Sequence, residues 1–437
     1  MNIFSDLKKK IEKKNAVITV VGLGYVGLPI ALEFCKKGFE VNGFDTDMKR
    51  IEKLRKRESY INDISSKELA GIIKKGKFNP GTCDDVLNTS DVIIVCVPTP
   101  LRKIKDPDIS YILHASRTLK KRLRPGQLII VESTTYPGTT RDVILPELEK
   151  SGYKVERDFL LAFSPERIDP GNEKYSFSNI PKVIGGISEK STSLGKLVYS
   201  SILDNVIGVS SCEVAEVTKL LENTFRIVNI GLINEFAMLC HKLGIDVWEV
   251  IEAAKTKPFG FMPFYPGPGI GGHCIPADPM YLSWKARKVG FKTKVIDLAA
   301  EINRMLPGEM VNRVEGILKR HGKKLGKAKV FLMGVTYKKD VNDLRESPAL
   351  EIIEKLYHNK AVVSYHDPYI PYLNIASIKE KSCALTPAML KKQDIVIVVA
   401  DHSGVDYKMI ARNAKLIFDT RNIFEKKGIR GENIIKL

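Results

Sequence analysis

The stretch "AVITVVGLGYVGLPIALEFCKKGFEVNGFD", residues 16–45, decides the fold. Its opening residues form an apolar, β-branched run of strand length. A helical pattern, "LPIALEFCKKG", follows closely spaced glycines, and a second strand-like run ends at Asp45. A strand, a helix and a second strand in this order predict one βαβ unit with parallel strands.

The same alternation continues along the N-terminal part of the chain. Apolar runs of strand length recur at residues 91–98, 127–134, 159–165 and 182–186, and helical segments separate several of them. Continuous apolar strands that alternate with helices indicate a parallel sheet covered on both faces. We therefore predict a Rossmann-like, doubly wound domain over residues 1–207.

The middle of the chain, residues 208–308, has a helical pattern instead. A capping-box spacing at Ser210 and Glu213 opens a long helix that Gly244 can end. Shorter helical patterns follow, and a second long helix is expected over about 295–320. The apolar stripe of the first long helix consists of Val217, Leu220, Leu221, Phe225, Val228, Leu232 and Phe236.

The alternation of strands and helices resumes in the C-terminal part, residues 309–437. Strand-like runs occur at residues 327–338, 361–368, 394–401 and 414–420, without a G-x-G-x-x-G string. The predicted fold class is therefore α/β, with two Rossmann-like domains bridged by a central helical region that contains one long helix.

Composition narrows the class of protein. The formal net charge is +18, yet the lysines are dispersed, and neither zinc-finger spacing nor an RNA-binding motif occurs. We therefore expect a lysine-rich solvated surface, no nucleic-acid partner, and room for a basic pocket that binds phosphates. No apolar run reaches the ~18 residues of a membrane span, and the start lacks a signal-like apolar region. We expect no membrane partner and a cytoplasmic location, with seven reduced cysteines, most of them in the core.

Gly22, Gly24 and Gly27 spell G-x-G-x-x-G between the first strand and its helix, and Asp45 follows 18 residues after Gly27. Such glycines permit a tight turn and a close approach of the backbone to a pyrophosphate at a helix N-terminus. A carboxylate at the end of the next strand accepts from ribose hydroxyls and repels a 2′-phosphate, which favours NAD over NADP. The alternative is a purely structural glycine turn.

Polar residues follow several of the other predicted strands. Thr99, Thr134 and Glu166 lie in "VPTP", "ESTTYPG" and "SPER", at strand ends where open parallel sheets bind ligands. Turn chemistry is the alternative for each of them alone. On the long helix, Lys219 and Asn223 share one face, which suits oxyanion stabilisation unless that face is merely solvated.

The loop "GPGIGGHCIPADP", residues 267–279, places Cys274 beside glycines that let a substrate approach. A position just before a helix lowers the pKa of a thiol and favours a nucleophile. Asp278 either acts in the chemistry or caps that helix. His273 next to Cys274 raises the question of zinc, but no partner pair stands at ligand spacing, so we expect no metal.

A nicotinamide site combined with a cysteine indicates a two-step oxidation. Oxidation of an alcohol needs no thiol, whereas carrying an aldehyde to an acid does. The thiolate adds to the aldehyde, the adduct loses a second hydride to become a thioester, and water releases a carboxylate. Lys219, Asn223, Asp278 and Glu166 are available as oxyanion donors and as carboxylates that position water.

The chain resembles the nucleotide-sugar 6-dehydrogenases of the UDP-glucose/GDP-mannose dehydrogenase family over almost its whole length. The motifs that carry the resemblance are "VVGLGYVGLP", "VPTP", "ESTTYPGTT", "SPERIDPGN", "EVTKLLENTFRIVNI", "GIGGHCIPADP" and "GVTYKKDVNDLRESPA". The resemblance implies oxidation of a sugar C6 alcohol to a carboxylate with two NAD⁺, and a homodimer or higher homo-oligomer with the central helix in the interface.

The resemblance also implies roles for individual residues. Cys274 is the nucleophile, Lys219 and Asn223 stabilise oxyanions, Asp278 and Thr134 hold the catalytic water, and Glu166 is the base for thioester hydrolysis. The implied NAD site comprises Gly22, Gly24, Tyr25, Val26, Gly27, Asp45, Arg50, Thr99, Thr134 and Lys338. The implied UDP-sugar site comprises Glu166, Arg167, Lys219, Asn223, Tyr265, Gly271, Lys338 and Arg345, with Arg421 as a further candidate.

The run "PFYPGPG" before the cysteine is similar to the branch that oxidises UDP-N-acetylglucosamine, which is the first expectation for the sugar. UDP-N-acetylmannosamine, the galacto epimer and UDP-glucose are the alternatives. A one-step dehydrogenase similar to the 6-phosphogluconate type would need neither Cys274 nor a second α/β domain. A non-catalytic NAD-binding scaffold would not explain the cysteine loop or the pair Lys219 and Asn223.

Overall fold

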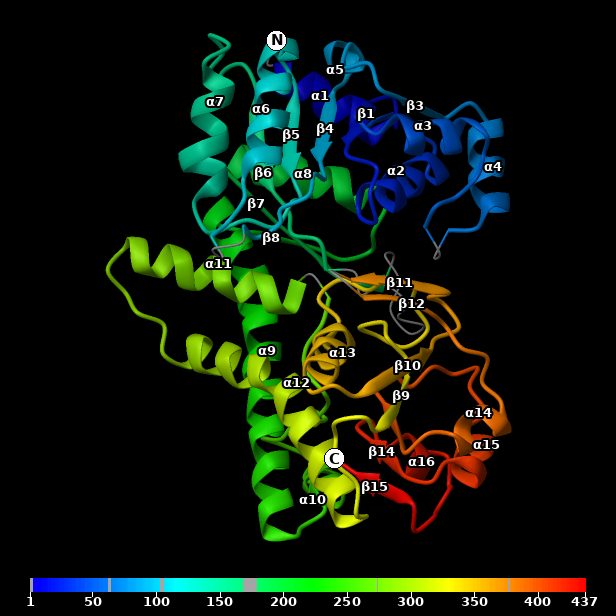
Figure 1. The fold of residues 1–437 in the computed structure, drawn as a ribbon. Coiled ribbons are helices and arrows are strands. Elements are labelled where there is room, and N and C mark those ends of the chain that lie inside the picture. The colour runs from blue at the N-terminus through cyan, green and yellow to red at the C-terminus, as the bar shows by residue number, and fades with distance from the viewer. Residues whose placement is uncertain (1–2, 62–63, 103–105, 168–178, 273, 376–377) are drawn as a thin grey trace. The chain divides into compact units, whose positions relative to one another are not determined.

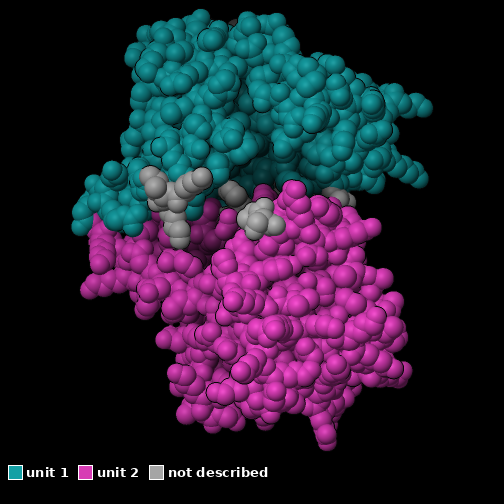
Figure 2. Space-filling model, in the orientation of Figure 1, with its two compact units in different colours: residues 1–222, 284–290 teal, residues 223–283, 291–437 magenta. Residues whose placement is uncertain are grey.

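The computed structural model describes residues 3–61, 64–102, 106–167, 179–272, 274–375 and 378–437. They fall into two compact units, coloured separately in Figure 2. The N-terminal unit comprises residues 1–222 and 284–290, and the C-terminal unit comprises residues 223–283 and 291–437. The predicted domain boundaries after residues 207 and 308 stay predictions.

The N-terminal unit contains an eight-stranded sheet in the order β3-β2-β1-β4-β5-β6-β7-β8. The chain leaves β1 toward β2 and β3 and then returns to β4 on the other side of β1, so a topological switch point lies at β1 and β4. All neighbours are parallel except β6 and β7, which are antiparallel, whereas the sequence predicted a parallel sheet throughout. The strands are β1 (Val17–Val21), β2 (Glu40–Phe44), β3 (Phe78–Gly81), β4 (Val92–Val95), β5 (Leu128–Val131), β6 (Leu160–Phe163), β7 (Lys182–Gly186) and β8 (Val206–Val209).

Helices cover both faces of this sheet. Successive side chains of a strand point to opposite faces, and in the central strands both sets are apolar. Val92 and Ile94 of β4 pack into one core with α1, α2, α3, α4 and α8. Ile93 and Val95 pack into the opposite core with α6, α7 and the start of α9. The helices are α1 (Ile3–Glu12), α2 (Gly27–Lys36), α3 (Met48–Arg55), α4 (Ser66–Lys74), α5 (Val86–Thr89), α6 (Ser110–Arg122), α7 (Leu145–Glu149) and α8 (Glu189–Ser200), with a π-helical turn at Thr140–Ile144 (Figure 1).

The C-terminal unit repeats the design with a five-stranded, all-parallel sheet in the order β10-β9-β13-β14-β15 and a separate antiparallel pair, β11 and β12. Helices α12 and α13 pack on one face, and α14, α15 and α16 on the other. The strands are β9 (Lys329–Met333), β10 (Val362–His366), β11 (Tyr372–Ile375), β12 (Ile378–Lys381), β13 (Ile395–Val398), β14 (Ile417–Asp419) and β15 (Ile434–Lys436). The remaining helices are α10 (Val247–Lys255), α11 (Cys274–Lys288), α12 (Val295–Arg320), α13 (Pro348–His358), α14 (Pro387–Lys391), α15 (Tyr407–Asn413) and α16 (Ile423–Lys426).

The predicted long helix is α9 (Cys212–Leu243), which crosses the division between the units after Glu222. The predicted capping box is off by one residue, because the hydroxyl of Ser211, not Ser210, accepts the N–H of Val214 at 3.3 Å. Gly244 ends the helix with a φ of +70°, as predicted. Most of the predicted apolar stripe is exposed: Val217, Leu221, Phe225, Leu232 and Phe236 all keep more than a third of their surface in solvent.

None of the described helices combines the length and the apolarity that crossing a membrane requires.

Candidate active site

The three glycines of the turn after β1 differ in what a side chain at each position would meet. Gly22 has a φ of +92°, and a Cβ there would lie 2.5 Å from the carbonyl oxygen of Cys96. A Cβ on Gly27, the first residue of α2, would lie 1.9 Å from the carbonyl oxygen of Gly22. A Cβ on Gly24 would meet no protein atom within 4 Å. The protein's own packing therefore explains two of the glycines, and Gly24 is the one that leaves room for a ligand.

The carboxylate of Asp45, which follows β2, is turned toward this glycine turn. Its Oδ2 accepts the N–H of Leu23 at 2.8 Å and the guanidinium of Arg50 at 3.1 Å. Its Oδ1 accepts the N–H of Asp47 at 2.8 Å. Turn, helix N-terminus and carboxylate thus form the arrangement that holds a dinucleotide in such sheets, and the residues present fit NAD.

Other residues predicted for the cofactor surround the same switch point. Tyr25 is exposed, Val26 is the residue before α2, and Thr99 is buried in the loop after β4. Thr134 is half-buried after β5. The loop that follows Thr134 is held to α9 by the buried carboxylate of Glu216, which accepts the N–H of Gly138 at 2.6 Å and that of Thr140 at 2.9 Å.

Glu166 and Arg167 follow β6 in the same unit. The Oε1 of Glu166 accepts the N–H of Arg167 at 2.6 Å, and its Oε2 lies 3.2 Å from the Nζ of Lys182. The guanidinium of Arg167 donates to Glu222 and to the carbonyl oxygen of Pro181. Lys182 and its partner Glu132 are part of this cluster and were not predicted as site residues.

Cys274 is exposed and is the first residue of α11 in the C-terminal unit. Of the seven cysteines, Cys35, Cys212 and Cys240 are buried, and Cys96 and Cys383 are half-buried against the two cores. Cys83 and Cys274 are exposed. His273, considered as a metal ligand with Cys274, lies outside the described residues. The N-terminal position of the thiol places it at the positive end of the helix dipole.

Asp278 lies one turn after Cys274, inside α11, so it does not cap the helix. Its Oδ2 instead accepts the side-chain amide of Asn223 at 2.5 Å, and both side chains are buried. An amide nitrogen carries two N–H donors, so this bond uses one of them and orients the other. Lys219, one turn before Asn223 on α9, belongs to the N-terminal unit.

The glycines before Cys274 pack against protein, whereas the sequence assigned their space to the substrate. A Cβ on Gly271 would lie 2.5 Å from the Cβ of Tyr337, and one on Gly272 would lie 2.9 Å from its ring. The N–H of Gly272 donates to the carbonyl oxygen of Arg345 at 2.9 Å. The cysteine loop is therefore docked on the segment that carries Lys338 and Arg345. The predicted roles of Gly271 and of Tyr265, which donates to Glu252 at 2.7 Å, stay predictions.

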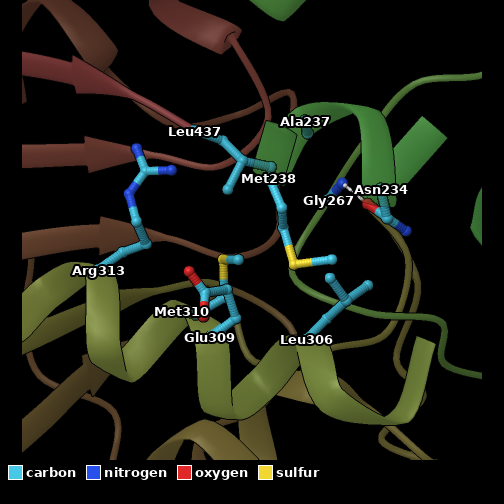
Figure 3. A pocket seen from close by; sticks show the side chains of 9 residues that line it. All are labelled: Asn234, Ala237, Met238, Gly267, Leu306, Glu309, Met310, Arg313 and Leu437. Atoms are coloured by element: carbon cyan, nitrogen blue, oxygen red, sulfur yellow. Dashed lines mark hydrogen bonds between the residues drawn. The ribbon is translucent and has the colours of Figure 1, made fainter. Parts of the chain in front are cut away.

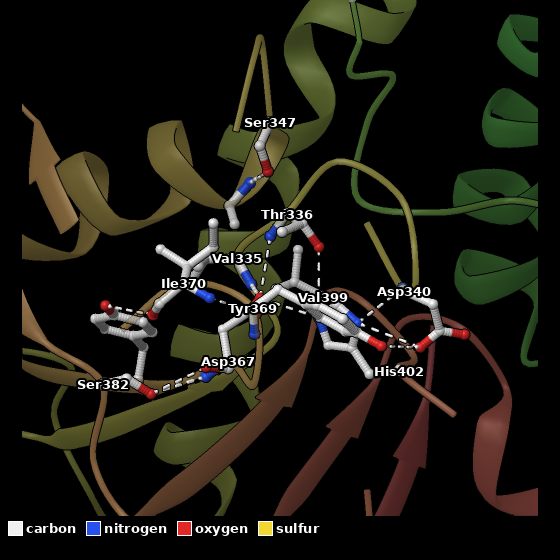
Figure 4. A network of polar contacts seen from close by, with 12 residues as sticks. Val335, Thr336, Asp340, Ser347, Asp367, Tyr369, Ile370, Ser382, Val399 and His402 are labelled. Atoms are coloured by element: carbon white, nitrogen blue, oxygen red, sulfur yellow. Dashed lines mark hydrogen bonds and ion pairs between the residues drawn. The ribbon is translucent and has the colours of Figure 1, made fainter. Parts of the chain in front are cut away.

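That segment is anchored by Asp367, which follows β10 (Figure 4). The buried carboxylate accepts the N–H groups of Val335 and Tyr369 at 2.7 and 2.8 Å and the Nε2 of His402 at 3.0 Å. The Nδ1 of His402 lies 3.0 Å from the N–H of Asp340 and must accept it, so the ring proton is on Nε2. Burial alone raises the pKa of Asp367, but these donors outweigh it and lower the pKa.

Two cationic residues of the C-terminal unit differ in their surroundings. Arg345 is exposed and pairs with Asp343, with an N–O distance of 2.6 Å. Arg421 follows β14 and donates from Nε to the carbonyl oxygen of Val399 at 2.8 Å, while Gly267 leaves room for its guanidinium. Burial lowers the pKa of Arg421.

A small cavity lies between α9, α12 and the C-terminal residue (Figure 3). Its lining includes Asn234, Met238, Leu306, Arg313 and Leu437, and none of the residues predicted for the site. The side chain of Asn234 already accepts the N–H of Gly267 and donates to Asn303. The cavity is therefore a packing gap rather than a candidate active site.

Within the described residues, the one group of three side chains that could hold a metal ion is Cys83, Asp84 and Asp85. Arg122 pairs with both aspartates, at 3.0 and 2.8 Å. None of these three residues is among those predicted for the site.

Comparisons with known proteins identify the family of the chain. Sequence models of the UDP-glucose/GDP-mannose dehydrogenase family match it as the NAD binding domain over residues 16–203, the central domain over 213–305 and the UDP binding domain over 331–426. The chain belongs to this family. Membership makes it a UDP-sugar dehydrogenase that uses NAD, and it confirms the resemblance, the cofactor and the fold class.

Family members with different sugars are similar to the chain. The UDP-N-acetyl-D-mannosamine dehydrogenase of Methanocaldococcus jannaschii is 36% identical, with 96% of this chain and 97% of the relative covered. The UDP-N-acetyl-D-glucosamine 6-dehydrogenase of Pseudomonas aeruginosa is 39% identical, with 82% and 84% covered. The structure of the UDP-D-ManNAc dehydrogenase of Pyrococcus horikoshii matches with a TM-score of 0.87 and 33% identity, covering 96% of this chain and 98% of that one.

Proposed function

We propose that the chain oxidises the C6 hydroxyl of a UDP-N-acetylhexosamine to a carboxylate in two NAD-dependent steps. The exposed Cys274 at the start of α11, one turn from the buried Asn223–Asp278 pair, carries the proposal. A one-step alcohol oxidation needs no such thiol. NAD, when bound, accepts a hydride from C6 in each oxidation.

Cys274 holds the half-oxidised sugar. Its thiolate adds to the aldehyde carbon and forms a C–S bond, and Lys219 and Asn223 stabilise the negative oxygen. After the second oxidation the sugar is a thioester. A water molecule held by Thr134 and Asp278 attacks the thioester carbon, Glu166 takes its proton, the C–S bond breaks and sulfur leaves as the thiolate.

The remaining predicted residues bind the two ligands. We assign the NAD site to Gly22, Gly24, Tyr25, Val26, Gly27, Asp45, Arg50, Thr99, Thr134 and Lys338. We assign the UDP-sugar site to Glu166, Arg167, Lys219, Asn223, Tyr265, Gly271, Lys338 and Arg345. The open space at Gly24 and the carboxylate of Asp45 support the first set, and the docking of the cysteine loop on the segment at Tyr337 supports the second.

For the sugar, the run "PFYPGPG" favours UDP-N-acetylglucosamine. The relatives favour a second candidate, UDP-N-acetylmannosamine, because several mannosamine dehydrogenases match over at least 93% of this chain. The two sugars differ in the direction of one substituent at C2.

A panel of UDP-GlcNAc, UDP-ManNAc, UDP-GalNAc and UDP-glucose with NAD⁺ tests the proposal. Two NADH per sugar and a product with one more oxygen and two fewer hydrogens are expected with an N-acetylhexosamine. One NADH per sugar would instead indicate the one-step dehydrogenase, and none with any sugar would contradict the activity. Cys274→Ala should abolish acid formation while NAD still binds, and full turnover in that variant would refute the covalent mechanism.

The exposed apolar stripe of α9 supports a homodimer or higher homo-oligomer. Leu221 is 62% exposed and Phe236 45% exposed, which is unusual for apolar side chains along one helix face. Analytical ultracentrifugation should show an oligomer, and Leu221→Lys should shift it toward the monomer. A chain that stays monomeric at high protein concentration would contradict the proposed oligomer. The cytoplasmic location stays a prediction.

A further inference from the structure

A buried lysine connects the loops after β5 and β6. Lys182, the first residue of β7, is buried. Its Nζ lies 2.8 Å from the Oε2 of Glu132 and 3.2 Å from the Oε2 of Glu166. The phenol of Tyr199 on α8 donates to the other oxygen of Glu132. A single ammonium is thus shared by two carboxylates.

The surroundings keep this ammonium charged. Burial alone lowers the pKa of Lys182, but the two carboxylates outweigh burial and raise it. Burial raises the pKa of Glu132, and the negative charge of Glu166 adds to that rise, whereas Lys182 and Tyr199 lower it.

Glu166 is the member of the cluster that reaches solvent. Its side chain is 12% exposed, against 5% for Lys182 and 0% for Glu132. The N–H of Arg167 holds its Oε1 and Lys182 holds its Oε2, so both oxygens are fixed in direction. The other titratable groups near it among the described residues are Cys96, Tyr199, Arg167 and Glu222.

We infer that Lys182 is a positioning residue that holds Glu166 as an oriented carboxylate. Glu132 competes with Glu166 for the same ammonium and so weakens its effect on Glu166. This inference rests on the proposed role of Glu166 as the base for thioester hydrolysis. In that step the water oxygen bonds to the thioester carbon, its proton goes to Glu166, and the C–S bond breaks to release the thiolate of Cys274. A charged lysine beside the base keeps it ionised and aimed before the proton arrives.

Two substitutions should move the pH dependence of acid formation in opposite directions. Lys182→Met removes the cation, so the acidic limb of kcat should move about one pH unit upward and acid release should slow at least tenfold. Glu132→Gln removes the competing carboxylate, so the same limb should move downward. Lys182→Arg should restore most of the rate. A purely structural role predicts lost protein or lost turnover with an unmoved limb.

A double variant and a matched control protect the test against misfolding. Glu132→Gln/Lys182→Met removes both charges of the fully buried pair together, and its limb should still lie above that of the wild type because Glu166 has lost the ammonium. Lys120→Met removes a lysine of the same unit that pairs with Glu147 at 2.7 Å, and should leave the limb in place. Limbs that move together in both single variants, or not at all, would overturn the inference.

The NADH count of the wild type separates this inference from the proposed function. Two NADH per sugar with unmoved limbs would reject the role of Lys182 alone. One NADH per sugar would reject the proposed function and the inference with it. In rapid-mixing experiments, Lys182→Met should retain NADH formation in the first turnover while carboxylate release is delayed, which a general loss of active-site structure would not produce.

Discussion

In the N-terminal unit Gly22 follows β1 and Asp45 follows β2, and in the C-terminal unit Gly334 follows β9 and Asp367 follows β10. The N–H of Gly22 donates to the carbonyl oxygen of Phe44 at 2.7 Å, and the N–H of Gly334 donates to that of His366 at 2.9 Å. A Cβ on Gly22 would lie 2.5 Å from the carbonyl oxygen of Cys96, after β4. A Cβ on Gly334 would lie 2.5 Å from that of Ala400, after β13. Each aspartate then accepts the next backbone N–H, at 2.8 and 2.7 Å.

The two carboxylates differ in their remaining partner. Asp45 meets Arg50, whose side chain is 40% exposed, whereas Asp367 meets His402, which is fully buried. The C-terminal turn also has no counterpart of Gly24 or Gly27 in its run "GVTYKK". The first glycine and the aspartate therefore serve the fold in both units. The unit matched by the NAD binding domain differs in its open glycine and in the half-exposed arginine beside its carboxylate.

The largest effect is expected at Asp367. Asp367→Ala leaves His402 and the N–H groups of Val335 and Tyr369 without their acceptor, and should lower the free energy of unfolding by about 3–5 kcal/mol. Urea unfolding measures it. Asp45→Ala should cost clearly less, because its partner Arg50 can turn to solvent. Equal costs would break the distinction between the two aspartates.

The paired glycines should behave alike. Gly22→Ala and Gly334→Ala combine a positive φ with a Cβ that meets a backbone carbonyl, so each should cost about 2–4 kcal/mol of unfolding free energy. Gly38→Ala is the control: it has a φ of +102° and nothing within 4 Å of its Cβ. That variant should cost about 1 kcal/mol. If Gly38→Ala is as costly as the other two, the close carbonyl contact is not the cause.

Ligand binding should separate the two units. Asp45→Ala should weaken NAD binding about tenfold to a hundredfold, because the ribose hydroxyls lose a charged acceptor. Titration of protein fluorescence with NADH measures the affinity. Asp47→Asn keeps its capping oxygen and is the matched control. An unchanged affinity in Asp45→Ala would remove the carboxylate from the cofactor site.

The smallest change in stability is expected at Gly24. Gly24→Ala places a methyl group in open space, so the free energy of unfolding should change by less than about 0.5 kcal/mol. NAD affinity should nevertheless fall about tenfold, because the methyl group occupies the space next to the pyrophosphate. Normal NAD affinity in this variant would show that the open space at Gly24 is not part of the cofactor site.

The sequence predicted the central strands and long helices because their signals are local. The βαβ unit at residues 16–45 and the helix α12, Val295–Arg320, are where apolar periodicity put them. The strands β3 and β8 were missed because "FNPG" and "VIGV" are short and mostly outside the core. The pair β11 and β12 was missed for a related reason, since its polar residues alternate at an exposed edge.

Within the site, motif spacing identified single residues but not their partners. Asp278 was weighed as a helix cap, and the partner that decides its role, Asn223, lies 55 residues away. Lys182 and Glu132 lie within the predicted strand runs 182–186 and 127–134, and no motif assigned a role to either of them. Two opposite charges in strands that are otherwise apolar are a usable signal, because a buried charge persists when it is paired.

The docking of Gly271 and Gly272 on Tyr337 and Arg345 links the sulfur to a distant part of the chain. The contact leaves no gap, so a movement of the backbone at Tyr337 should be passed on to the cysteine loop. If the UDP-sugar binds at Lys338 and Arg345 as proposed, its binding should therefore change the alkylation rate of Cys274. A thiol-reactive dye would detect that change without any turnover.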